Sequence, residues 1–244
     1  MSTKNRIRLF ASQNLEEGLI YVPSEAQNHY LKNVMRLKTG DEVFLFDGIN
    51  GEFRSTVIEE GKKSLTLKIQ AKVLNFEKSP DIWLLFAPLK KENTDIVLQK
   101  AVELGASKII PVQTEYTLKT TLKPERIHTQ IIEAAEQSRR QDIPQASDLI
   151  PFGDLLHQWP SNRKLIYLDE TGSGDSFENA AKHLKEPAAL FVGPEGGFSK
   201  KELEILKKLP YTCAITLGKR ILRAETACIA ALSCWQAFCG DWRK

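Results

Sequence analysis

The sequence predicts an α/β protein with two domains, a small N-terminal β-barrel at residues 1–75 and a larger domain with a mostly parallel sheet at residues 76–244. Two observations support this. Short strand-like runs separated by turn sequences dominate as far as about residue 75. After that point, apolar strand-like runs alternate with helical segments, which is typical of parallel sheets covered by helices.

The N-terminal part has the alternation of a half-buried sheet. Leu65, Leu67 and Ile69 alternate with polar residues, as expected of a strand with one buried face. Glycine-containing turn sequences bound the runs, and Ser24 is placed to cap one helix. The expected strands are residues 42–46, 52–59 and 64–73.

The C-terminal part alternates apolar runs with helices. The runs are short and lack polar positions, which fits strands buried on both faces. Ser199 and Glu202 form a capping-box sequence at the start of one helix. The last helix is apolar nearly all round, so it must be buried in the fold or against a second subunit. The expected strands are residues 82–87, 109–112, 165–168, 188–192 and 213–217, and the helices include 94–104, 124–139 and 225–238.

Composition argues against several protein classes. The net charge is only +3, so any RNA-binding surface must come from the arrangement of residues in space. The four cysteines form no Cys-x-x-Cys pair and the four histidines are scattered, so we expect no metal site. We find neither a signal-peptide pattern nor an apolar run of membrane-spanning length, so we expect no membrane association and a cytoplasmic protein.

Two glycine-containing loops follow neighbouring strand-like runs. Gly193–Gly197 holds three glycines and a proline, so backbone groups can approach a ligand closely. The spacing fits neither a Walker A phosphate loop nor a dinucleotide-binding fingerprint. The second loop, residues 217–227, interleaves cations with Ile221 and Leu222. Each loop alone is compatible with a purely structural role, but together they indicate a cleft at the carboxyl ends of the strands.

Five segments in order resemble the 16S ribosomal RNA uridine N3-methyltransferases of the SPOUT superfamily. The resemblance covers nearly the whole chain and includes Gly193-Pro-Glu-Gly-Gly-Phe-Ser199 and Leu217-Gly-Lys-Arg-Ile-Leu-Arg-Ala-Glu-Thr-Ala227. The other segments are residues 29–48, 99–111 and 136–144. The resemblance implies a PUA-like N-terminal barrel, a trefoil-knotted methyltransferase domain, and a homodimer formed through that domain. It also implies S-adenosyl-L-methionine as methyl donor and a uridine of 16S rRNA in the small ribosomal subunit as acceptor.

The resemblance implies a set of cofactor-binding residues that come from three strand ends. They are Leu168, Glu170, Val192, Gly193, Pro194, Glu195, Gly196, Gly197, Leu217, Gly218, Ile221, Leu222, Arg223 and Thr226.

Methylation of uridine N3 requires loss of the N3 proton, so a cation near the uracil oxygens would help. The first candidate for this cation is Arg140, which would reach in from the other subunit of the dimer. The second candidate is Arg223. Glu195 or Glu225 is a candidate proton acceptor, although each could instead hold its loop through backbone N–H groups.

In the N-terminal domain, four cations could contact RNA phosphates or could simply be solvated charges: Arg6, Arg8, Lys32 and Arg36.

Two positions depart from the family pattern. Tyr116 stands where the family usually has Arg, and Arg139 stands where it usually has Gly. The alternative functions are a non-catalytic RNA-binding or ribosome-assembly factor with a degenerate cofactor pocket, and a doubly wound nucleotide-binding enzyme. The intact loops argue against the first, and the missing phosphate-loop spacing argues against the second.

Overall fold

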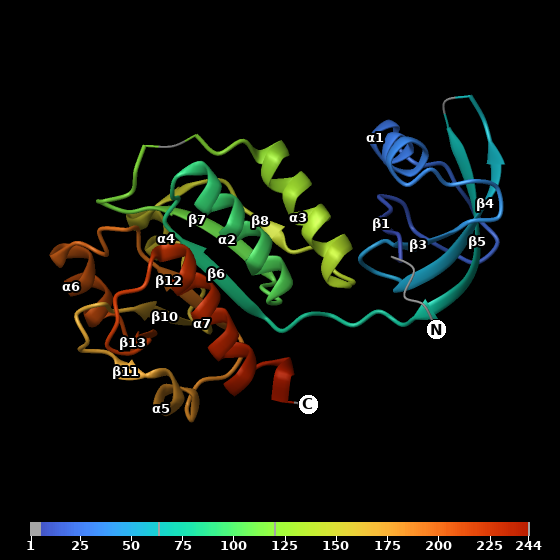
Figure 1. Cartoon of the computed structure of the whole chain (residues 1–244). Helices are drawn as coiled ribbons and strands as arrows, with labels where there is room; N and C mark the ends of the chain where they lie inside the picture. Colours follow the sequence, from blue (N-terminus) through green and yellow to red (C-terminus); the bar gives the residue numbers. More distant parts are fainter. Residues whose placement is uncertain (1–5, 63, 120, 244) are drawn as a thin grey trace. The chain divides into compact units, whose positions relative to one another are not determined.

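A computed structural model describes residues 6–62, 64–119 and 121–243 (Figure 1). The chain divides into two compact units. The first holds the chain up to Lys78 together with Ala135–Ile143, and the second holds Ser79–Ala134 and Pro144–Lys244. Each unit has its own sheet.

The first unit is built on a five-stranded sheet in the order β1-β3-β4-β5-β2. β1 pairs with β3 in parallel, and the other pairs are antiparallel. Register shifts between β4 and β5 mark irregularities of the kind that bend a sheet. The strands are β1 (Arg8–Phe10), β2 (Ile20–Tyr21), β3 (Glu42–Phe46), β4 (Glu52–Glu60) and β5 (Leu65–Leu74).

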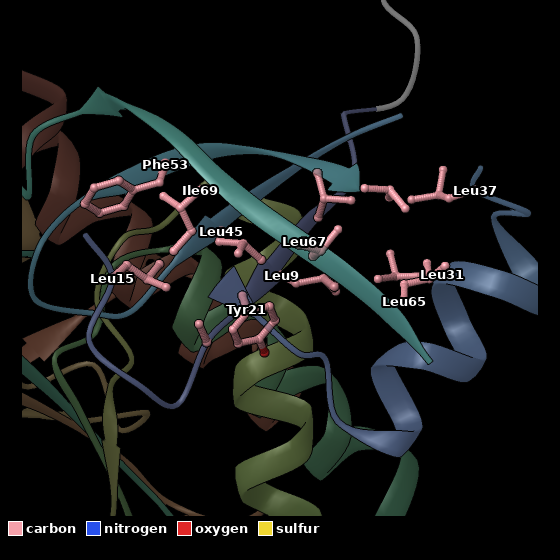
Figure 2. Close-up of a cluster of buried hydrophobic side chains, with 13 residues drawn as sticks. Leu9, Leu15, Tyr21, Leu31, Leu37, Leu45, Phe53, Leu65, Leu67 and Ile69 are labelled. Carbon is pink, nitrogen blue, oxygen red and sulfur yellow. The ribbon is translucent and has the colours of Figure 1, made fainter. Parts of the chain in front are cut away.

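A capped helix and a leucine-rich core complete this unit. Ser24 and Gln27 form a capping box at the start of α1 (Glu25–His29), which continues into the π-helix η1 (Tyr30–Val34). Figure 2 shows the buried side chains of the core, among them Leu9, Leu31 and Leu67. The expected alternation on residues 64–73 is confirmed, because Leu65, Leu67 and Ile69 are fully buried.

The second unit has an eight-stranded, wholly parallel sheet in the order β11-β13-β10-β12-β6-β7-β8, with β9 paired to β7. The expected mostly parallel sheet is therefore confirmed. The strands are β6 (Ile82–Phe86), β7 (Lys108–Gln113), β8 (Gln145–Ala146), β9 (Ile150–Pro151), β10 (Lys164–Leu168), β11 (Asp175–Ser176), β12 (Ala188–Val192) and β13 (Thr212–Thr216).

Helices accompany this sheet. The apolar helix α7 packs against α2 and also contacts α5, β12 and β6, which explains why few of its positions are polar. The two-residue strands and the short helices α4 and α5 were not predicted, because such short elements leave no periodic pattern. The trefoil knot stays a prediction. The helices are α2 (Lys91–Glu103), α3 (Pro124–Ser138), α4 (Phe152–His157), α5 (Phe177–Ala181), α6 (Lys200–Lys208), α7 (Ala224–Phe238) and the 3₁₀ helix η2 (Asp241–Arg243).

Candidate functional site

A cavity of about 290 Å³ opens at the carboxyl ends of three adjacent strands in the second unit. β10 lies between β12 and β13 in the sheet, so the segments that follow these strands converge. This is where ligands bind in open parallel sheets. Most of the expected cofactor residues line the cavity, namely Leu168, Glu170, Val192, Gly193, Pro194, Glu195, Leu217, Gly218, Ile221, Leu222 and Arg223.

The loop after β12 is shaped by its glycines. Gly197 has φ +68° and donates its N–H to the Pro194 carbonyl at 2.9 Å. A Cβ on Gly197 would lie 1.9 Å from Oε1 of Glu170, so the loop lies against the exposed Glu170 side chain, whose carboxylate would have to move to admit a methyl group. A capping box between Ser199 and Glu202 then starts α6. Together these features fix a tight loop beside the cavity.

The loop after β13 is exposed and positively charged. Gly218 turns the chain with φ +100°, and Lys219 and Arg220 follow as exposed cations that line the cavity. Ile221 is 87% exposed. Arg223 is exposed at the N-cap position of α7 and makes no side-chain capping bond. The cavity mouth therefore combines positive charge with apolar side chains.

Asp169 is a lining residue that sequence reasoning missed. It is only 2% exposed and accepts hydrogen bonds from the backbone N–H of Thr171 at 2.9 Å and from the Ser173 hydroxyl at 2.7 Å. Burial raises the pKa of the Asp169 carboxyl, but these hydrogen bonds outweigh it and the pKa lies below its ordinary value. The Asp-x-Thr pattern directly after a strand, typical of a side-chain turn, was the available signal.

Three expected cofactor residues lie off the cavity lining: Gly196, Gly197 and Thr226. Gly197 shapes the loop instead. A Cβ on Gly196 would lie 3.4 Å from Cβ of Tyr116, so this glycine faces the tyrosine that departs from the family pattern. Thr226 is exposed on the first turn of α7.

The candidate proton acceptors differ in position. Glu195 is exposed and lines the cavity, as a group that meets a substrate must. Glu225 is half-buried and does not line it. Its Oε2 atom is buried with no hydrogen-bond partner among the described residues. The geometry favours Glu195.

Arg140, the first candidate for the catalytic cation, does not lie at the cavity. Arg140 belongs to the first unit and its side chain is 5% exposed. Its Nε and one terminal nitrogen donate to the two carboxylate oxygens of Asp142 at 2.8 and 3.0 Å. It does not line the cavity of the second unit. A bidentate ion pair holds the guanidinium in one geometry. The catalytic role of Arg140 stays a prediction, and Arg223 is the candidate that lines this cavity.

The four cations expected to contact RNA differ in how accessible their side chains are. Arg8 is buried, stacks 3.7 Å from the Phe46 ring centroid, pairs with Glu52, and donates to the carbonyls of Ala135 and Arg140. Burial lowers the pKa of Arg8, with Glu52 opposing the shift. These partners engage the Arg8 guanidinium within the fold, which favours a structural role, and an RNA contact of Arg8 stays a prediction.

The other three cations are more accessible. Arg6 pairs with Glu52 and stacks on Phe44, but its side chain is 33% exposed. The Lys32 ammonium donates to the carbonyls of Gly61 and Lys62 at 2.6 and 3.0 Å. Arg36 is exposed. Arg6 and Arg36 therefore remain the better candidates for phosphate contacts.

No cluster of three or more His, Cys, Asp or Glu side chains suited to a metal ion occurs among residues 6–62, 64–119 and 121–243. Within the same ranges, every helix is too short or too polar to span a bilayer.

Comparisons with known proteins show which family the chain belongs to. A family model described as RNA methyltransferase domain matches residues 77–236, and one described as RNA methyltransferase PUA domain matches residues 24–70. Relatives named ribosomal RNA small subunit methyltransferase E include one from Rickettsia conorii, 32% identical over 93% of both chains, and one from Bacillus subtilis, 30% identical over 91% of both.

A solved structure supports the same family. The crystal structure of a ribosomal RNA small subunit methyltransferase E from Neisseria gonorrhoeae bound to S-adenosyl methionine superposes with a TM-score of 0.89 and 28% identity, over 98% of this chain and 100% of that one. The chain therefore belongs to the SPOUT RNA methyltransferases with a PUA domain, the family whose relatives are named ribosomal RNA small subunit methyltransferase E.

Proposed function

We propose that this chain transfers a methyl group from S-adenosyl-L-methionine to N3 of a uridine in 16S ribosomal RNA of the small subunit. The observation that carries the proposal is the cavity formed where the loops after β10, β12 and β13 meet. It occurs in a chain that matches, over nearly its whole length, a structure solved with S-adenosyl methionine. Residues 76–244 would be the catalytic domain and residues 1–75 the RNA-binding domain.

The lining and the volume of the cavity suit this cofactor. A methyl donor that carries adenosine needs backbone hydrogen bonds for the adenine edge and apolar walls for the ring. Gly193 lines the cavity and has no side chain, so its backbone N–H and C=O groups can approach a ligand closely. Leu217 and Leu222 supply apolar lining on the opposite loop. At about 290 Å³ the cavity lies near the lower end of the usual range for ligand pockets.

The chain's residues would mainly position the uracil and handle its proton. The bound cofactor supplies a methyl group on a sulfonium, which is open to in-line attack. Glu195, exposed at the cavity, would accept the N3 proton as the N3–methyl bond forms. Arg223, at the same cavity, would stabilise the negative charge that develops on the uracil oxygens.

Dimerisation through the C-terminal domain and a cytoplasmic location belong to the same proposal. Phe238 and Trp242 are 40% and 57% exposed at the end of the chain, and Ile229 and Cys234 of α7 are half-buried. A second copy packed there would cover these side chains. Sedimentation equilibrium would show a monomer if this part of the proposal is wrong.

Two measurements test the reaction. Calorimetric titration should show one S-adenosylmethionine bound per chain, and methyl groups from labelled cofactor should appear at N3 of a uridine when small subunits from a deletion strain are the substrate. Binding without transfer to either subunits or naked 16S rRNA would favour an RNA-binding assembly factor. Absence of cofactor binding would refute the proposed enzyme.

A further inference from the structure

A second cavity, also of about 290 Å³, lies within the first unit. Arg6 and Arg8 come to it from the β1 segment, Tyr30 and Met35 from η1 and its end, and Glu136 and Arg139 from the end of α3. Tyr30 and Met35 are half-buried, and Arg139 is exposed. The cavity thus combines cations with an aromatic and a thioether side chain.

Most of the charges around this cavity are already engaged. Arg8 is buried and paired with Glu52, which also pairs with Arg6. One carboxylate oxygen of Glu136 accepts the backbone N–H of Phe10 at 2.9 Å. In contrast, the Arg139 side chain has no hydrogen-bond or ion-pair partner within the part of the chain that the structure describes. Arg139 is therefore a cation at the cavity whose charge the described fold does not use.

The backbone of Arg139 is also unusual. It has φ +60°, directly after the last residue of α3, where glycine is the common choice because it adopts this conformation without strain. The only other non-glycine residue with positive φ among the described residues is Arg36, next to the lining residue Met35. Strained non-glycine positions persist where the surrounding structure holds them, and they cluster at functional sites.

We infer that this cavity binds one nucleotide of single-stranded ribosomal RNA, with its phosphate on Arg139 and Arg6 and its base against Tyr30 and Met35. The inference rests on the proposed function, which supplies RNA as the substrate. Unpaired bases are commonly held by stacking on aromatic side chains, and their phosphates by arginine. Arg139 is a binding residue here and takes no part in methyl transfer.

Arg139→Gly tests the inference, because it removes the charge and also relieves the backbone strain. The full-length variant should have a higher thermal midpoint than the parent chain, yet bind RNA more weakly. Anisotropy titration with a fluorescein-labelled single-stranded oligouridine should show about fourfold lower affinity at about 0.15 M salt, the contribution of one released counterion. The slope of log affinity against log salt should fall by about 0.7.

Matched variants separate this effect from general charge. Arg139→Lys keeps the charge and should keep the salt slope. Lys68→Gln removes an exposed cation of β5, outside the cavity lining, and should change affinity by less than about twofold. Photocrosslinking with 5-iodouridine RNA should label Tyr30.

The outcomes are distinguishable. RNA affinity that is unchanged in Arg139→Gly, with the thermal midpoint raised, would show that Arg139 only ends α3 and would overturn the inference. A crosslink confined to residues of the second unit would do the same. Failure of the proposed function would appear instead as loss of S-adenosylmethionine binding in the parent chain, while Arg139-dependent RNA binding could persist.

Discussion

Gly197→Ala would place a methyl group against the carboxylate of Glu170, which would have to move. The new Cβ would lie 1.9 Å from Oε1 of Glu170, and the residue would keep φ near +68°. The left-handed backbone costs a non-glycine residue about 1–2 kcal/mol. Forcing the Glu170 side chain off its preferred rotamer adds about 1 kcal/mol. We therefore expect the free energy of unfolding to fall by about 2–3 kcal/mol.

The same change should weaken the cofactor site. Glu170 lines the cavity, so displacing its carboxylate and the loop after β12 should raise the dissociation constant for S-adenosylmethionine about tenfold, or about 1.4 kcal/mol. Urea unfolding measures the first effect, and calorimetric titration of the folded variant measures the second.

Two glycines in the same unit supply the controls. Gly172 also has positive φ, +78°, but a Cβ there would meet nothing within 4 Å, so Gly172→Ala should incur only the backbone cost. Gly153 lies in α4 with ordinary φ and open space, so Gly153→Ala should stabilise by about 0.5–1 kcal/mol. If Gly197→Ala matches Gly172→Ala in both stability and cofactor affinity, the loop does not depend on contact with Glu170 and the reasoning fails.

Three further predictions concern single side chains. Glu195→Gln should lower the methyl-transfer rate, measured by single-turnover transfer, by about a hundredfold or more. The affinity for the cofactor, measured by calorimetry, should change by less than about twofold. An equally large loss of cofactor affinity would assign Glu195 to cofactor binding instead. Arg8→Met should lower the free energy of unfolding of the first unit by about 3 kcal/mol, because the Glu52 carboxylate, whose side chain is 1% exposed, loses its buried partner. An unchanged midpoint in urea unfolding would contradict a structural role for Arg8. Since the pKa of Asp169 is depressed in the folded chain, its stabilisation is present above the unfolded value of about 4 and is lost as pH falls through the folded value. Asp169→Asn should therefore destabilise the chain at neutral pH, with the difference closing in acid; a difference independent of pH would rule out the carboxylate as its source.

The sequence predicted much of the fold because the strands and long helices leave strong local patterns. The buried run of β12 and the capping box at Ser199 appear in the structure where they were expected. The exact pairing order could not be predicted, since β12 inserts between β10 and β6 and nothing local in the chain encodes neighbours so far apart. The contribution of Ala135–Ile143 to the first unit was missed for the same reason.

The cavity was predicted better than the roles of its charged residues. Loops after adjacent parallel strands must meet at one edge of the sheet, so the glycine-containing segments located the cavity. Asp169 was missed because its role as a hydrogen-bonded loop anchor depends on Ser173 and Thr171 folding back onto it.

The arginines show why charge type alone does not assign a role. Arg8, Arg139 and Arg140 are chemically identical, and the sequence placed Arg8 among the RNA contacts and Arg140 at the reaction centre. In the structure the two buried ones have carboxylate partners, Glu52 for Arg8 and Asp142 for Arg140, which offset the cost of burying their charge. Arg139, which the sequence marked only as a departure from glycine, is the exposed and strained one. A buried arginine with fixed partners has little freedom to meet a substrate, so partner and exposure, which only the fold defines, decide which cation is available to RNA.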